Sequence, residues 1–117
     1  MATFAKRILS GSTSGRSILI AATATPGTAI HTAVTGASDI DEVYLYAVNS
    51  STADVKLTIE FGGVTSPNDL IEYTVPAENG LHLVVPGCPM NGALAIAAFA
   101  GTTNVITVSG WVNRITA

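Results

Sequence analysis

The stretch NSSTADVKLTIEFGG, residues 49–63, carries the pattern from which the fold is predicted. It opens with a polar, turn-like run and then alternates, with apolar side chains at Val55, Leu57, Ile59 and Phe61. Such alternation is typical of a strand with one buried face, because successive side chains point to opposite sides. We therefore expect these apolar side chains to lie between two sheets, with Lys56, Thr58 and Glu60 facing outward.

The rest of the chain repeats this kind of pattern between turn signals. Strands of about six residues at roughly ten-residue spacing, about eight in all, are typical of a β-sandwich or jelly roll. Asn79-Gly80 predicts a hairpin that pairs 81–85 with 70–75, and 86–92 is expected to be a turn-rich link. No window sustains a helical face, so we predict an all-β, jelly-roll-like single domain. The expected strands are 16–22, 29–34, 42–48, 55–61, 69–75, 81–85, 93–100 and 105–112.

The first 15 residues differ in composition from the rest. Lys6 and Arg7 are followed by a Gly/Ser run, which is typical of a flexible segment. We expect a flexible N-terminal arm over 1–15 and the β-sandwich domain over 16–117.

Composition limits the classes of function. The 117 residues are enough for one domain with a real core. Charged residues make up only 11% of the chain, against about a quarter in typical domains, which favours a protein packed against partners. The net charge of −3 provides no basic surface for nucleic acid, so we expect no nucleic-acid partner.

The apolar segments indicate neither a membrane span nor a signal peptide. Residues 93–112 are interrupted by polar residues and glycine and read as two strands, and 1–15 lacks an apolar core. The single Cys88 cannot form an internal disulfide. We expect no membrane partner, and synthesis in a reducing cytoplasm.

Histidine and cysteine do not form a metal motif. His31, His82 and Cys88 lack the short spacings of zinc ligands, so each histidine is expected at a strand surface or subunit contact. No cluster supplies a nucleophile, a base and an oxyanion site together. We predict no catalytic, metal-binding or cofactor-binding residues, no cofactor, and no enzyme activity.

The acidic residues are assigned structural positions. Asp39, Asp41 and Glu42 are expected on a solvated loop, because their spacing does not match a calcium loop. Glu60 and Glu72 lie on strands that could be neighbours, as in a glycosidase pair. A domain of this size can hardly build the cleft such a pair needs.

Aromatic side chains are few, at 6% of the chain. If exposed together, they would form a sugar-stacking platform, but such a low content is unusual for a carbohydrate-binding protein. Trp111 is expected in the core or at an interface. The aromatic residues that we consider possible interface residues are Tyr44, Tyr46 and Trp111.

Three segments carry a resemblance to a known group of proteins: DEVYLYAVNSSTADVKLTIEFGG (41–63), LIEYTVPAENGLHLVVPG (70–87) and VITVSGWVNRIT (105–116). The chain after about residue 8 resembles small virion proteins encoded in the structural gene modules of tailed bacteriophages. Head decoration (cement) proteins are the most similar in function. The resemblance rests on strands and turns, and it implies a non-enzymatic particle component without a chemical signature.

The resemblance also implies a location and partners. Decoration proteins are small β-rich domains, often trimeric, that clamp onto the outside of the expanded capsid. We therefore expect the major capsid protein as partner, a homotrimer, and a location on the capsid surface after synthesis in the bacterial host cytoplasm. Our hypothesis for the capsid-anchoring residues of the arm is Phe4, Lys6, Arg7, Ile8 and Leu9.

Two alternatives remain open at this point. The protein could be a neck or tail adaptor of the same particle, which would occur in far fewer copies than a decoration protein. It could instead be a glycan-binding module exposed on the particle, in which case Trp111 would be needed for binding.

Overall fold

The computed structural model describes residues 2–117, and in that range it contains nine β-strands and no helix. The predicted all-β class is confirmed. The strands are β1 (Thr3–Ile8), β2 (Ile18–Leu19), β3 (Thr28–Thr32), β4 (Ile40–Asn49), β5 (Val55–Phe61), β6 (Leu70–Val75), β7 (His82–Met90), β8 (Ala95–Ala100) and β9 (Ile106–Thr116).

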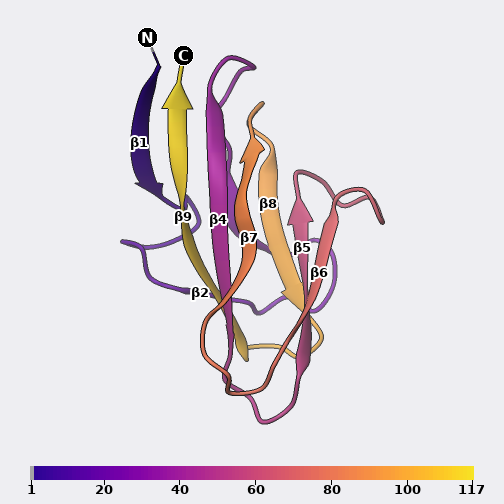
Figure 1. The fold of residues 1–117 in the computed structure, drawn as a ribbon. Coiled ribbons are helices and arrows are strands. Elements are labelled where there is room, and N and C mark those ends of the chain that lie inside the picture. The colour runs from indigo at the N-terminus through magenta and orange to yellow at the C-terminus, as the bar shows by residue number, and fades with distance from the viewer. Residues whose placement is uncertain (1) are drawn as a thin grey trace.

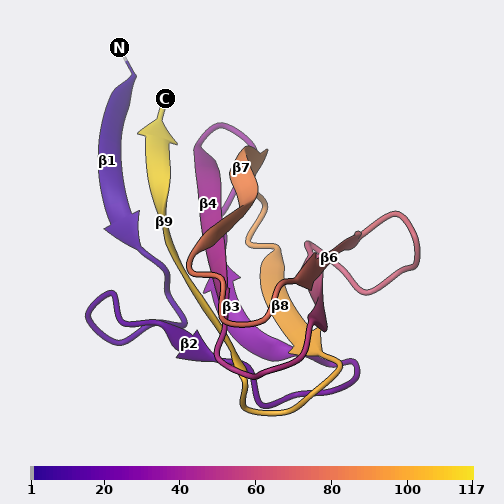
Figure 2. The same ribbon diagram turned by 60° about the horizontal axis from the view of Figure 1, so that its bottom comes forward.

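The strands form two antiparallel sheets that pack as a sandwich (Figures 1 and 2). Sheet A has the order β1-β9-β4-β7, with β2 also paired to β9, and sheet B has the order β3-β8-β5-β6. From β2 onward the chain changes sheet at every connection except the β5–β6 hairpin. With β1 and β2 counted as two parts of one strand position opposite β9, this is the connectivity of a jelly roll.

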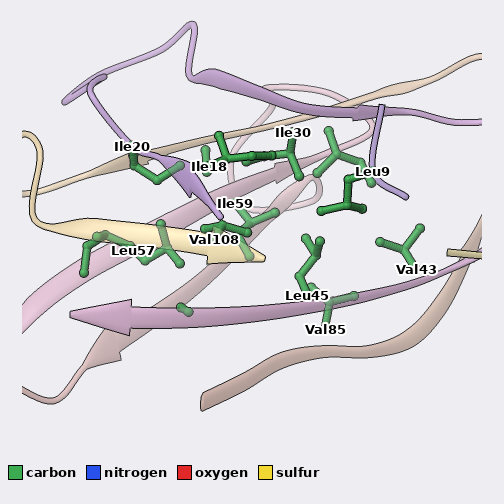
Figure 3. Close-up of a cluster of buried hydrophobic side chains, with 14 of the residues drawn as sticks. Leu9, Ile18, Ile20, Ile30, Val43, Leu45, Leu57, Ile59, Val85 and Val108 are labelled. Atoms are coloured by element: carbon green, nitrogen blue, oxygen red, sulfur yellow. The ribbon is translucent and has the colours of Figure 1, made fainter. Parts of the chain in front are cut away.

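One apolar core lies between the sheets. The prediction for the inward side of β5 is confirmed: Val55, Leu57 and Ile59 are buried in this core, and Phe61 is partly buried and packs against it. Figure 3 shows Leu57 and Ile59 among side chains from both sheets, such as Leu45 of β4. Full burial of each such side chain contributes about 1.5–3 kcal/mol relative to exposure, so the core is the main source of stability.

The outward face of β5 corrects one expectation. Lys56 is exposed as predicted, but Thr58 and Glu60 are buried. The Gly27 N–H donates a hydrogen bond of 2.8 Å to Glu60 Oε1, which ties the start of β3 to this side of sheet B. The alternating pattern identifies the two faces of a strand, but it does not show what covers the outer one.

The predicted hairpin between 70–75 and 81–85 is wrong. Strand β6 pairs with β5 in sheet B, whereas β7 pairs with β4 in sheet A. Glu78 and Gly80 do adopt positive φ, as a turn there requires, but the turn carries the chain from one sheet to the other. Turn residues indicate where the chain reverses and leave the strand partner open.

Strand β7 also continues through the segment predicted as a turn-rich link. It runs on to Met90 through Pro86 and Pro89. Proline lacks a backbone N–H, and it is tolerated here because β7 is the edge strand of sheet A. Two register shifts between β4 and β7 accommodate the irregular stretch.

The flexible arm predicted for residues 1–15 is corrected as well; Met1 lies outside the described residues. Residues Thr3–Ile8 form β1, which pairs antiparallel with β9 along the edge of sheet A (Figure 1). The Gly/Ser run after it forms turns, with Ser12 N–H donating to Leu9 C=O at 3.0 Å. Phe4, Lys6 and Ile8 share one face of β1, but the lysine between the two apolar residues leaves no clear period-two pattern from which the strand could be predicted.

Candidate functional site

The outer side of sheet A carries an unusually apolar surface. We call it the sheet A outer face and define it by the side chains on the side of the sheet opposite the core. Its most exposed large residues are Phe4, Ile8 and Leu83, which are 68%, 54% and 51% exposed. The residues that form the face are Phe4, Lys6, Ile8, Ile40, Glu42, Tyr44, Tyr46, Leu83, Trp111, Asn113 and Ile115, with Leu19, Val48, Pro86, Thr107 and Ser109 on the same side of the sheet.

Strand register brings the three predicted interface aromatics together on this face. Trp111 of β9 is paired with Tyr44 of β4 on one side and with Ile8 of β1 on the other. The Tyr44 and Trp111 rings stack with centroids 4.3 Å apart, and Lys6 Nζ lies 4.4 Å from the Trp111 centroid. Tyr46, two residues along β4, is paired with Leu83 of β7. The face is therefore a continuous apolar and aromatic band across four strands.

Charge is sparse on the sheet A outer face. Lys6 and Glu42 are its two charged residues, and the Glu42 carboxylate already accepts a 2.9 Å hydrogen bond from Asn113 Nδ2. Larger apolar patches rimmed by polar residues commonly mark interaction sites. This is the physical character expected of a surface that another protein covers.

The five predicted anchor residues separate into three groups. Phe4, Lys6 and Ile8 lie on the sheet A outer face, whereas Arg7 points to the other side of β1. Leu9 is buried in the core, so it cannot contact a capsid and is removed from the anchor hypothesis. The chain enters the sandwich at Leu9, which holds the end of β1 in place.

A buried polar cluster links the two sheets near β1. Asp41 of β4 is fully buried; Arg114 of β9 donates to it from Nε at 2.7 Å and from a terminal nitrogen at 2.9 Å. His31 of β3 lies 2.9 Å from the same carboxylate through Nε2. The expectations that Asp41 lies on a solvated loop and that His31 lies at a surface are therefore wrong.

The electrostatics of this cluster favour a charged Asp41. Burial alone would raise the pKa of Asp41, but the hydrogen bonds from Arg114 and His31 outweigh it and hold that pKa below the ordinary value. The bonds to Asp41 raise the pKa of Arg114 in turn. Because the Ser10 backbone N–H donates to His31 Nδ1 at 2.9 Å, the ring hydrogen lies on Nε2 and points to Asp41.

Ser10, His31 and Asp41 have the residue types of a hydrolase triad but not its hydrogen-bond geometry. The Ser10 group that reaches His31 is the backbone N–H, and the Ser10 hydroxyl accepts a 2.7 Å hydrogen bond from the Thr32 N–H. Asp41 is also neutralised by Arg114, whereas a triad carboxylate supports an imidazolium. The arrangement fixes β3, β4 and β9 to one another and to the end of β1.

A cavity of about 450 Å³ lies beside this cluster, under β1. Three of the chain's five Lys and Arg residues line it, and no acidic residue does. Because Arg114 is already paired with Asp41, Lys6 and Arg7 supply the local positive charge of the β1 edge, on a chain of negative net charge. Its lining residues are Lys6, Arg7, Ile8, Ser10, His31, Thr32 and Arg114.

The other residues considered for chemistry lie apart. Glu72 faces Thr58 across β5 and β6 and pairs with Lys56 at 2.8 Å, while Glu60 is buried one position further along the same face. Cys88 is a half-buried free thiol on β7. Within residues 2–117 there is no group of three or more His, Cys, Asp or Glu side chains placed to hold a metal ion.

The alternation along β4 already indicates that Asp41 is buried. Asp41 is in phase with Val43, Leu45 and Ala47, the inward positions of its strand, so the alternation itself placed it inside. A buried carboxylate requires a partner. Arg114, a cation within the last strand, is the residue that pairs with Asp41 in the structure.

Comparison with protein-family models, with curated proteins and with solved structures returned no match for this chain. In the part of the chain that the structure describes, no helix is long and apolar enough to cross a membrane. Fold and surface together define the class: a jelly-roll β-sandwich with an exposed apolar sheet face, in which the N-terminal strand β1 forms one edge of sheet A.

Proposed function

We propose that this protein is a non-enzymatic structural protein of a tailed bacteriophage particle, and that it decorates the outer surface of the head and stabilises the shell. The sheet A outer face is the single observation that carries the proposal. The resemblance of the sequence to phage virion proteins supports the choice of particle, and the fold adds only that jelly rolls occur in viral capsid and lectin domains, since a fold does not define a function.

The sheet A outer face also supports the proposed partners. The sheet A outer face would pack against the major capsid protein or a second copy of the chain, with Trp111 and Tyr44 at its centre. Interfaces are enriched in such aromatic residues at their centre. Repeated over a shell as homotrimers, modest contacts of this kind would add up to firm attachment.

The face predicts a specific binding defect. Ile8→Lys and, separately, Leu83→Lys should each weaken binding to expanded heads that lack the protein by about tenfold or more, because a buried unpaired ammonium opposes docking. Both side chains are more than half exposed, so the domain should fold normally. Co-sedimentation of purified variants with such heads, at matched concentrations, measures the effect.

Leu94→Lys is the matched control. Leu94 is 48% exposed and precedes β8, on the side of sheet B, so the same change of charge and size leaves the sheet A outer face intact. Binding by Leu94→Lys should equal that of the unsubstituted protein. Equal binding by all three variants would remove the sheet A outer face from the proposal.

A further inference from the structure

Glu60, near the end of β5, is a buried carboxylate that the sandwich satisfies only in part. It is 2% exposed, and its Oε1 accepts a hydrogen bond from the Gly27 N–H. Its Oε2 is also buried and has no hydrogen-bond partner within the described residues. An unpartnered buried acceptor is costly, more so when it is charged, and such a group in a native structure calls for an explanation.

The same residue lines a small pocket on the outer side of sheet B. The pocket has a volume of about 230 Å³, and apart from Glu60 its walls are small or apolar. Sites for drug-sized ligands begin at about 300 Å³, so this pocket suits a single unbranched chain. Its other lining residues are Pro26, Gly62, Gly63, Val64, Ala95 and Ala97.

The charges around the pocket favour a cation. Asp69 packs its carboxylate against Gly63, and Glu72 lies on the same face of sheet B as Glu60. The one basic residue of β5, Lys56, is already paired with Glu72 at 2.8 Å. A positively charged group entering the pocket would therefore meet the carboxylates of Glu60 and Asp69, with no free cation of β5 to oppose it, while the charge of Glu72 is offset by Lys56.

We propose that this pocket binds a cation carried on an unbranched aliphatic stem, as in the side chain of lysine or arginine. The N–H donors would reach Oε2 of Glu60 after a small rotation of the carboxylate, and the apolar walls would cover the methylene groups. The site lies on sheet B, apart from the sheet A outer face, and it does not depend on the proposed role in the phage head.

An NMR titration with n-butylammonium tests the site directly. The Gly27 amide is the reporter because it is bonded to Glu60, and the amides of Gly62 and Ala97 report on the walls. Saturable shifts of these three amides with millimolar affinity are expected for a ligand of this size. The uncharged isostere 1-butanol should bind about tenfold more weakly, because it loses the charge-assisted bond.

Three variants separate binding at Glu60 from a general charge effect. Glu60→Gln keeps an acceptor for Gly27 but removes the charge, and Ala95→Ile fills the pocket while keeping Glu60; both should abolish the shifts. Glu72→Gln removes the same charge from the same face outside the pocket, and its affinity should stay within about twofold. Because Ala95→Ile leaves Glu60 in place, the test stands even if Glu60→Gln fails to fold.

Two further probes identify the source of the cation. Nα-acetyl-lysine methylamide represents a lysine side chain of a protein, and putrescine represents a free polyamine. The probe that binds more tightly identifies the kind of molecule that supplies the cation. The proposal is overturned if the unsubstituted protein shows no saturable shifts, if 1-butanol binds equally well, or if Glu60→Gln binds n-butylammonium unchanged.

Discussion

The variant Gly110→Ala is expected to lose most of the stability of the fold. Gly110 lies in the middle of β9 with φ of +155°, opposite Leu45 of β4. A β-carbon there would overlap the backbone carbonyl oxygen of Tyr44, which belongs to the central strand pair of sheet A and cannot turn away. The expected loss exceeds about 4 kcal/mol, the range of exceptional single substitutions.

Urea unfolding followed by the fluorescence of Trp111, the single tryptophan, measures this loss. The matched control is Gly101→Ala, where the added β-carbon would have Lys56 C=O at 3.9 Å as its nearest contact, an ordinary separation. That variant should change the free energy of unfolding by no more than about 0.5 kcal/mol. Equal stability of the two variants would contradict the close packing of the β9 backbone against the β4 backbone at Gly110.

The second large effect is expected for Arg114→Ala. This change removes both hydrogen bonds that the guanidinium donates to Asp41. The Asp41 carboxylate, which is 0% exposed, then keeps only two donors, the His31 ring and the Val34 N–H. Breaking a buried ion pair by removing one partner costs about 3–5 kcal/mol. Typical domains have only about 5–15 kcal/mol of stability, so the variant should be close to unfolding.

Lys56→Ala provides the comparison with an exposed ion pair. Lys56 and Glu72 are also in contact, at 2.8 Å, but both side chains are about half exposed. Removing this pair should cost less than about 1 kcal/mol in the same urea experiment. A similar cost for Lys56→Ala and Arg114→Ala would contradict the account of the buried cluster.

The Asp41 cluster also predicts the response to acid. The pKa of Asp41 is lower in the folded protein than its ordinary value of 3.8. The stabilisation that ionised Asp41 gives the fold is therefore fully present above pH 3.8 and is lost as the pH falls through the lower pKa of the folded state. Urea unfolding of the unsubstituted protein should therefore show stability falling below about pH 4. In Asp41→Asn this contribution should be absent, and an unchanged acid response would assign it to other carboxylates.

The sequence predicted the fold class because the class depends on local alternation. The inward side chains Val55, Leu57 and Ile59 were identified correctly, and the all-β sandwich followed from repeating that pattern. Strand partners were not predictable in the same way. The turn at 78–80 is present, yet β7 pairs with β4 rather than with β6, because pairing is decided by the packing of the whole core.

The candidate surface was predictable only in part. Tyr44 and Tyr46 share a face by their spacing alone, but Trp111 joins them through the register of two strands that lie more than 50 residues apart in sequence. The buried Glu60 carboxylate accepts its hydrogen bond from Gly27, which is 33 residues away in the sequence. Period-two alternation contains no information about such distant neighbours.

The central proposal is that this domain covers the outside of a phage head. Immunogold labelling of purified particles from the phage that encodes the chain, with antibody raised against the recombinant domain, tests it most directly. The proposal predicts gold over the whole head, since a decoration protein would rival the major capsid protein in copy number. Gold confined to one vertex or to the tail, or particles without gold, would contradict it.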